Sequence, residues 1–162
     1  MNGEELRLNL PAVLEQVLSG RYDAPMSTSD GLIWVVHPES TLGAVLVREK
    51  WRPHVLFKAG VVLDAPFTPS LCYHVAHFNR NLWTGRLYLR HNPQENVGLA
   101  LIEDIVFGDA LDTEQGRGIE DLAWRIDWLM KIAGALSQDT IEEYGGQPFG
   151  ANDAMFLDIE SP

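Results

Sequence analysis

The sequence has a single cysteine, Cys72, so no disulfide can form within one copy of the chain. Long hydrophobic runs are also missing, because uncharged apolar stretches such as 32–36 and 59–63 fall far short of the roughly 20 residues that span a bilayer. The first ten residues are acidic and lack the basic and then apolar order of a signal peptide. Together these absences predict a cytoplasmic protein without a membrane partner.

Basic residues are scarce, since 12 lysines and arginines stand against 23 aspartates and glutamates, which gives a net charge of -11. Residues 1–102 carry nine acids and nine bases, whereas residues 103–162 carry fourteen acids and three bases. An acidic surface repels phosphate backbones, which argues against nucleic acid as a partner. The charge is compatible with two roles, simple solubility or a surface that meets a basic protein partner.

Motifs for catalysis are missing as well. The sequence has no glycine-rich phosphate loop, and no serine or cysteine lies in a recognisable nucleophile motif near a histidine. A group of acids does not follow the EF-hand spacing and is typical of solvated strand ends: Glu103, Asp104, Asp109 and Asp112. We therefore predict that the chain is not an enzyme and that it has no catalytic, cofactor-binding or metal-binding residue.

Two histidines leave one alternative open. His74 and His77 are three residues apart and share a helical face, while Cys72 points elsewhere. Metal sites need three or four converging ligands, and no third ligand is evident nearby in the sequence. A small metal-dependent enzyme or regulator is the alternative hypothesis, and a polar helix face is the simpler interpretation.

The longest periodic stretch runs from Gly118 to Tyr144 and predicts one long amphipathic helix. Acids occupy its first turn, where the helix dipole favours them, and Gly145 and Gly146 follow its end. Its apolar stripe consists of Ile119, Leu122, Ala123, Ile126, Leu129, Met130, Ala133 and Leu136. A helix of this length needs the rest of the chain to cover that stripe.

Trp124 and Trp128 lie one turn apart on this helix, mostly away from the apolar stripe. Charged residues at 125 and 127 favour partial exposure of their face. Tryptophans are enriched in interface hot spots, where each can contribute on the order of 2 kcal/mol or more. We predict that the pair binds a partner, and the alternative is that both rings belong to the core.

The remaining pattern predicts two more helices, over 4–19 and from Thr68-Pro69 to Thr84-Gly85. Five strands are predicted at 32–37, 42–48, 54–63, 86–90 and 97–107. The predicted fold is α+β in the order α-β-β-β-α-β-β-α, with helices packed on an antiparallel sheet. Residues 1–144 are predicted to form a single domain.

Residues 145–162 are predicted to be an acidic, flexible tail. In an alternative, its segment 154–159 covers a client surface of its own or a neighbouring chain. The first strand is apolar on both faces, as in strands covered on both sides. Another chain should cover any face that this chain leaves open, so Leu32 and Trp34 are predicted as further partner-binding residues.

The second helix and the strand after it carry a family resemblance. Residues 75–79 (VAHFN) end in a step from a hydrophobic residue to asparagine, and residues 85–89 (GRLYL) open a strand with Gly-Arg. An apolar strand and a long amphipathic helix follow. This pattern resembles the type III secretion chaperone fold, and more closely the YbjN-like group that shares it, over roughly residues 4–144.

The resemblance implies a bacterial homodimer that holds an extended segment of a partner protein on exposed apolar surface, without enzymatic activity. YbjN-like domains are described as regulators or chaperone-like modules, so the resemblance also implies a small regulatory domain as an alternative. No residue of this chain inherits a catalytic role. The tryptophan pair and the acidic tail depart from the family pattern.

Overall fold

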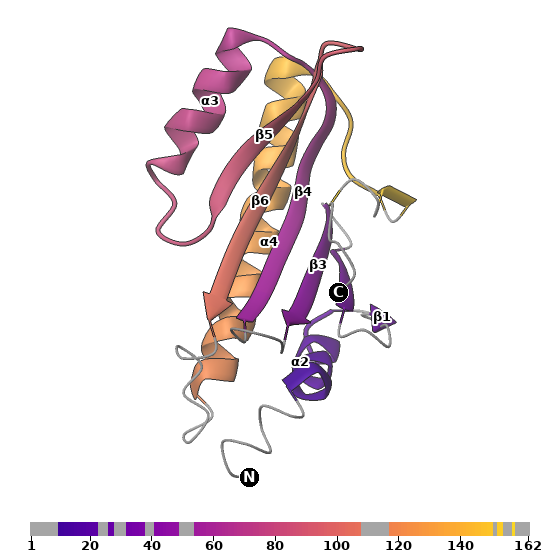
Figure 1. Cartoon of the computed structure of the whole chain (residues 1–162), viewed down its shortest axis with the longest axis vertical. Helices are drawn as coiled ribbons and strands as arrows, with labels where there is room; N and C mark the ends of the chain where they lie inside the picture. Colours follow the sequence, from indigo (N-terminus) through magenta and orange to yellow (C-terminus); the bar gives the residue numbers. More distant parts are fainter. Residues whose placement is uncertain are drawn as a thin grey trace.

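The computed structural model describes residues 10–22, 26–27, 32–37, 41–48, 54–107, 117–150, 152–153 and 157. In chain order these ranges form helix α2 (Leu10–Ser19), strands β1 (Met26–Ser27), β2 (Leu32–His37), β3 (Thr41–Arg48) and β4 (His54–Pro66), helix α3 (Pro69–Asn79), strands β5 (Arg86–Asn92) and β6 (Val97–Phe107), and helix α4 (Arg117–Tyr144) (Figure 1). The predicted α+β order is confirmed, with the short strand β1 added.

All six strands belong to one antiparallel sheet in the order β1-β2-β3-β4-β6-β5. Strands β2, β3 and β4 form an antiparallel meander, in agreement with the predicted antiparallel sheet. The chain then leaves through α3, and β6 returns between β4 and β5. The long strands β4 and β6 are therefore each paired on both sides, and β1 and β5 lie at the edges of the sheet (Figure 1).

The bounds of α2, α3 and β4 can be compared with the predicted ones. Helix α2 is described from Leu10, and residues 4–9 of the predicted helix lie outside the described residues. Helix α3 ends at Asn79 and not at Thr84-Gly85, because the N–H groups of the next two residues turn back in tight bonds, from Arg80 to the His77 carbonyl and from Asn81 to that of Phe78. Strand β4 continues to Pro66, beyond the predicted end at residue 63, and its register against β6 shifts between Gly60 and Val62 and again between Val62 and Ala65.

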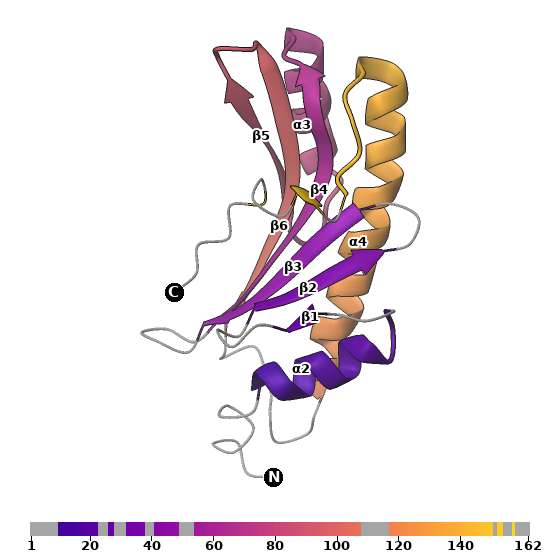
Figure 2. The ribbon, with the colours of Figure 1, turned by 90° about the vertical axis from the view of Figure 1, so that its right-hand side faces the viewer.

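Helix α4 lies along the sheet and supplies most of the predicted stripe to the core (Figure 2). All eight stripe residues are buried: Ile119, Leu122, Ala123, Ile126, Leu129, Met130, Ala133 and Leu136. A Cβ atom on Gly43 of β3 would lie 2.5 Å from the sulfur of Met130. The bare glycine therefore lets the helix approach the strand closely at this point.

Alternation along β3 and β4 divides their side chains between two faces of the sheet. Val45 and Phe57 belong to the main core cluster, to which α2, α3 and α4 also contribute. Ala44 and Leu46 belong to a second, smaller cluster. The helices therefore cover one face, and the second cluster lies on the opposite face.

The second cluster contains part of the predicted tail. Phe149 is 4% exposed and Leu157 is fully buried, and both pack with Leu63 of β4. Residues 145–150 leave the end of α4 and come down beside β4 (Figures 1 and 2). These residues are packed on the sheet, whereas the division into a domain at 1–144 and a flexible tail stays a prediction.

Within the described ranges, no helix combines the length and the apolar character that crossing a bilayer requires.

Candidate functional site

Three indole rings meet on the surface of the molecule, and we call Trp83, Trp124 and Trp128 the tryptophan cluster. The ring centroids of Trp83 lie 5.3 Å from Trp124 and 5.1 Å from Trp128, and the two helix tryptophans are 6.5 Å apart. Trp83 is 59% exposed and Trp124 is 47% exposed. Large aromatic rings that stay this exposed in a folded domain mark a surface suited to binding another molecule.

The cluster joins two parts of the chain that are about forty residues apart in sequence. Trp124 and Trp128 share a face of α4 because four residues make about one helical turn. Trp83 lies between α3 and β5, in a segment that ends at Gly85 with a φ of 73°. The guanidinium of Arg125 donates a hydrogen bond to the hydroxyl of buried Thr84, which ties this segment to α4.

Sequence reasoning found two of these rings and missed the third. Trp124 is exposed, in agreement with the exposure predicted for its helix face, while Trp128 is half-buried and packs against the main core, and partner binding by the pair stays a prediction. Trp83 carries no periodic signal, since it follows the helix and precedes a Thr-Gly turn. The available sequence signal was a tryptophan directly before a Thr-Gly turn, but the contact of Trp83 with α4 depends on the tertiary fold.

The other two predicted partner-binding residues lie on β2. Leu32 pairs with Leu46 across the sheet, and Trp34 pairs with Met26 on one side and Ala44 on the other. The side chains of Leu32 and Trp34 are outside the described part of the structure. Strand β2 lies near one edge of the sheet and β5 at the other, so the structure does not bring these residues into the tryptophan cluster.

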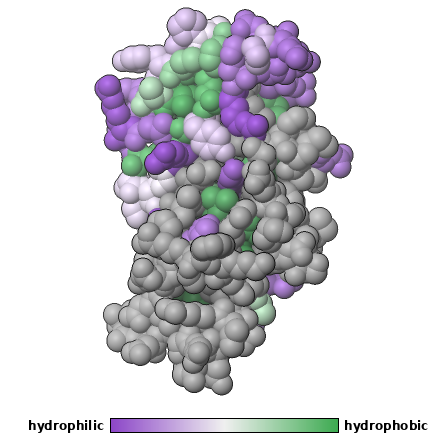
Figure 3. All heavy atoms as spheres, in the orientation of Figure 1, coloured by the Kyte–Doolittle hydropathy of each residue, from purple (hydrophilic) through white to green (hydrophobic). Residues whose placement is uncertain are grey.

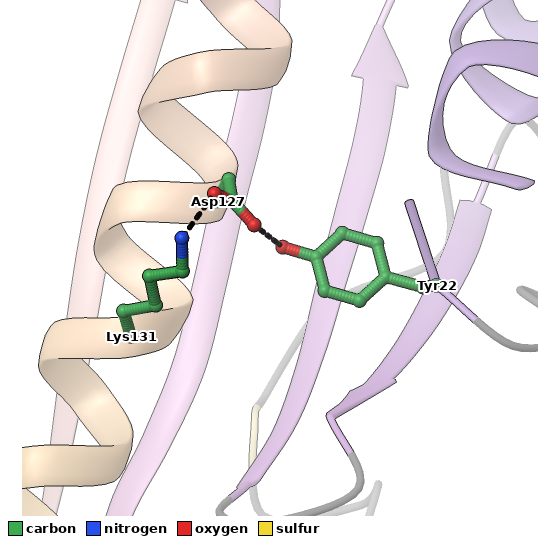
Figure 4. Close-up of polar contacts among 3 residues, drawn as sticks. All are labelled: Tyr22, Asp127 and Lys131. Carbon is green, nitrogen blue, oxygen red and sulfur yellow. Dashed lines mark hydrogen bonds and ion pairs between the residues drawn. The ribbon is translucent and has the colours of Figure 1, made fainter. Parts of the chain in front are cut away.

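A polar contact joins α4 to the segment that follows α2 (Figure 4). The hydroxyl of Tyr22, just after α2, donates to one carboxylate oxygen of Asp127 at 2.9 Å, and the ammonium of Lys131 donates to the other at 2.9 Å. Burial and the adjacent carboxylate raise the pKa of Tyr22 above its usual range. Burial alone would raise the pKa of Asp127, but the hydrogen bonds from Lys131 and Tyr22 lower it below its ordinary value.

The histidines of α3 lie beside aromatic rings. The His77 ring stacks with Tyr73 at 6.1 Å, and the His74 ring lies 5.2 Å from Tyr144. No three histidine, cysteine, aspartate or glutamate side chains converge as a ligand set among the residues that the structure describes. The hypothesis of a metal-dependent enzyme built on His74 and His77 therefore gains no support from this geometry.

Solved structures share this architecture. YbjN from E. coli, a proposed transcription regulator, matches with a TM-score of 0.58 and 12% identity, covering 81% of this chain and 90% of YbjN. This chain has the YbjN fold. The resemblance in the helix, the Gly-Arg turn and the long last helix is thus confirmed at the level of the fold.

Two complexes also match. A chain of the ExsC-ExsE complex matches with a TM-score of 0.44 and 19% identity, and the match covers 75% of this chain and 96% of the matched chain. The Yersinia pestis type III secretion chaperone SycH, in complex with a stable fragment of YscM2, gives 0.42 at 10% identity, over 74% and 98%. No protein-family model matches the sequence, and no curated protein does so either.

Proposed function

We propose that this chain is a non-enzymatic, chaperone-like protein-binding module of the bacterial cytoplasm that holds a segment of a partner protein. The observation that carries this proposal is the tryptophan cluster, with two of its three rings about half exposed or more. Its base is rigid, because Trp128 packs on the core and Arg125 anchors the segment that carries Trp83. A rigid aromatic patch loses little conformational entropy when it binds.

The negative charge of the chain favours a basic partner segment. Glu120 and Asp121 are exposed on α4 one turn before Trp124, and the whole chain carries a net charge of -11. Arginine and lysine side chains stack favourably on indole rings and are attracted by nearby carboxylates. The partner segment should therefore combine arginine or lysine with apolar residues.

The proposed working form is a homodimer. Strand β1 pairs with β2 at Ile33 and Trp34, and β2 is rich in apolar residues. A second copy that packs at this edge of the sheet would explain why Leu32 and Trp34 belong to so apolar a strand. Light scattering on a sizing column tests the dimer, since the monomer has a mass of 18.1 kDa.

Binding is best tested with labelled 15-residue peptides in two matched sets, one rich in Arg and Leu and one rich in Glu and Leu. We expect the basic set to bind the wild-type chain, and Trp124→Ala to weaken that binding roughly tenfold or more, the usual effect of removing an interface tryptophan. The matched control is Tyr73→Ala, which removes a 70% exposed ring from α3. It should leave binding unchanged.

Equal binding of the two peptide sets, or an equal loss with Tyr73→Ala and Trp124→Ala, would contradict the proposed site. A clean monomer that binds no peptide would favour the alternative of a small regulatory domain. The likeness to YbjN is what motivates that alternative.

A further inference from the structure

Strand β4 is longer than its neighbour β3, and this leaves a stretch of its edge for another segment. The pairing between the two strands ends at Gly43 opposite Ala59, while β4 continues for seven more residues to Pro66. On the other side, β6 accompanies β4 as far as Pro66. The part of β4 around Leu63 therefore lies beyond the residues that pair with β3.

The chain's own C-terminal segment lies on this edge. Leu63 and Gln147 form an antiparallel bridge, in which the N–H of each residue donates to the carbonyl of the other at 2.8 Å. This is the hydrogen-bonding unit by which an added strand joins a sheet. Residues 147–149 thus imitate a short strand added to β4.

An aromatic side chain completes the contact. A Cβ atom on Gly60 would fall 2.1 to 2.4 Å from three ring atoms of Phe149, so the ring lies directly against the bare backbone of that glycine. The ring is 4% exposed and packs in the second cluster with Ala44 and Leu46. Glycine at this position makes room for a flat ring that any larger residue would displace.

The connection between α4 and this segment is short. Gly145 and Gly146 have φ angles of 83° and 103°, which turn the chain from the end of the helix onto β4. Only these two residues separate the helix from Gln147. Among the described residues, the backbone bridge at Leu63 and the side chain of Phe149 hold this segment on β4, and segments with few contacts tend to open locally at low free energy.

We propose that the edge of β4 at Leu63, together with the place where a ring packs against Gly60, is a docking site for an extended segment of a partner protein, which the chain's own residues 147–149 cover. The segment should bridge Leu63 through its backbone and carry an aromatic side chain two residues later. Strand addition supplies affinity through the main chain and specificity through a side-chain pocket. The seated segment defines both requirements, and this site does not depend on the tryptophan cluster.

The surroundings agree with an apolar strand as the occupant. In Figure 3, hydrophobic residues gather in the upper part of the molecule between hydrophilic margins. The second cluster has Leu56 and Tyr88 packed at its border.

The test uses the full chain and a fluorescent peptide of residues 145–157, GGQPFGANDAMFL. In the wild type the tethered segment competes at high effective concentration, so the peptide should bind weakly. Phe149→Ala in the chain loosens the cover, and binding should become roughly tenfold tighter or more. A peptide with alanine in place of Phe149 is the matched probe, and it should bind neither chain.

A second variant tests the packing of the Phe149 ring against Gly60. Gly60→Ala, combined with Phe149→Ala, should abolish peptide binding, because the new methyl group occupies the position of the ring. Tyr73→Ala, which removes an exposed ring of α3 outside this site, should leave peptide binding unchanged, so that loss of this site and a general loss of binding are told apart. Binding that is equal in all variants, or absent from a folded Phe149→Ala chain, would overturn the proposal.

Hydrogen exchange gives an independent measure on the unmodified protein. The amides of Leu63 and Gln147 should exchange much faster than the amides of β4 that pair with β3. Residues 147–149 are expected to leave β4 while the strands of the sheet stay paired. Equal protection of both sets would show that the segment is a permanent part of the sheet. That result would also overturn the proposal, even if the variants failed to fold.

Discussion

The side-chain amide of Asn79 makes both of its hydrogen bonds to one residue, Leu87. The amide nitrogen donates to the Leu87 carbonyl at 2.6 Å, and the Leu87 N–H donates to the amide oxygen at 2.7 Å. Asn79 is the last residue of α3, and Leu87 is a buried residue of the edge strand β5. The asparagine amide thus satisfies both backbone groups of Leu87, as a neighbouring strand would, and joins the end of α3 to the sheet.

This relationship gives a physical reason for the sequence motif in which a helix ends at asparagine before Gly-Arg. Gly85, with its positive φ, turns the chain so that β5 returns past the end of α3. The paired bonds then set the register of β5 against that end. Trp83 lies within this turn, so the same contacts help to hold the exposed ring in place.

The first prediction concerns Asn79→Ala. It leaves both backbone groups of Leu87 without their partner, and an unsatisfied part-buried group costs about 1–3 kcal/mol. We expect the free energy of unfolding in urea to fall by about that amount. Asn79→Asp is the matched control, because it keeps the acceptor and loses the donor, so it should also destabilise. Full stability of both variants would contradict the proposed role of the amide.

The second prediction concerns alkaline pH. Burial and the Asp127 carboxylate raise the pKa of Tyr22 in the folded state above the unfolded value of about 10. Above that value the unfolded chain loses the proton while the folded chain keeps it, so the stability from this group is complete below about pH 10 and declines as the pH rises further. Tyr22→Phe should be less stable at neutral pH, and its stability should fall less steeply above about pH 10. If the free energy of unfolding falls equally steeply above about pH 10 in the wild type and in Tyr22→Phe, the proposed contribution of Tyr22 is wrong.

The third prediction concerns acidic pH. Hydrogen bonds from Lys131 and Tyr22 outweigh burial and lower the pKa of Asp127 in the folded state. Between the folded and unfolded values, the unfolded chain binds the extra proton, so stability from this group is present above about pH 4 and declines as the pH falls through the folded value. Asp127→Asn should therefore show a weaker acid dependence than the wild type in urea titrations. An unchanged acid dependence would argue against this assignment.

The sequence predicts well those elements whose signal is local. Helix α4 was visible because eight apolar residues recur at helical spacing, and all eight are buried. Trp128 was harder to place, because its face is shared between core and solvent. The contact between Trp83 and α4 could not be predicted, since it depends on long-range contacts, the pairing of β5 with β6 and the hydrogen bond from Arg125 to the Thr84 hydroxyl.

The packing of Phe149 on Gly60 is a similar case. Nothing in the composition of residues 145–162 marks Phe149 as buried, because the burial depends on β4 being longer than β3. A lone glycine in a strand can signal a bulge or a close approach by another segment. Here both occur near Gly60, and only the three-dimensional pairing shows which segment approaches.

The last prediction separates stability from binding within the tryptophan cluster. Trp128 packs on the core, so Trp128→Ala should lower the free energy of unfolding by about 2–4 kcal/mol, somewhat less than for a fully buried ring. Trp83→Ala and Trp124→Ala remove more exposed rings and should each cost about 0.5–1.5 kcal/mol, the usual value of an aromatic contact. The measurement is urea unfolding of the three single variants.

A double variant then tests whether Trp83 and Trp124 act as one surface. Their rings touch, so the cost of removing both should be smaller than the sum of the single costs by about 0.5–1.5 kcal/mol. Peptide binding should follow a different order, with Trp124→Ala more damaging to binding than to stability, because exposed rings contact the partner. Should Trp124→Ala destabilise the fold as much as Trp128→Ala, the ring belongs to the core, and the surface assigned to partner binding would have to be sought elsewhere.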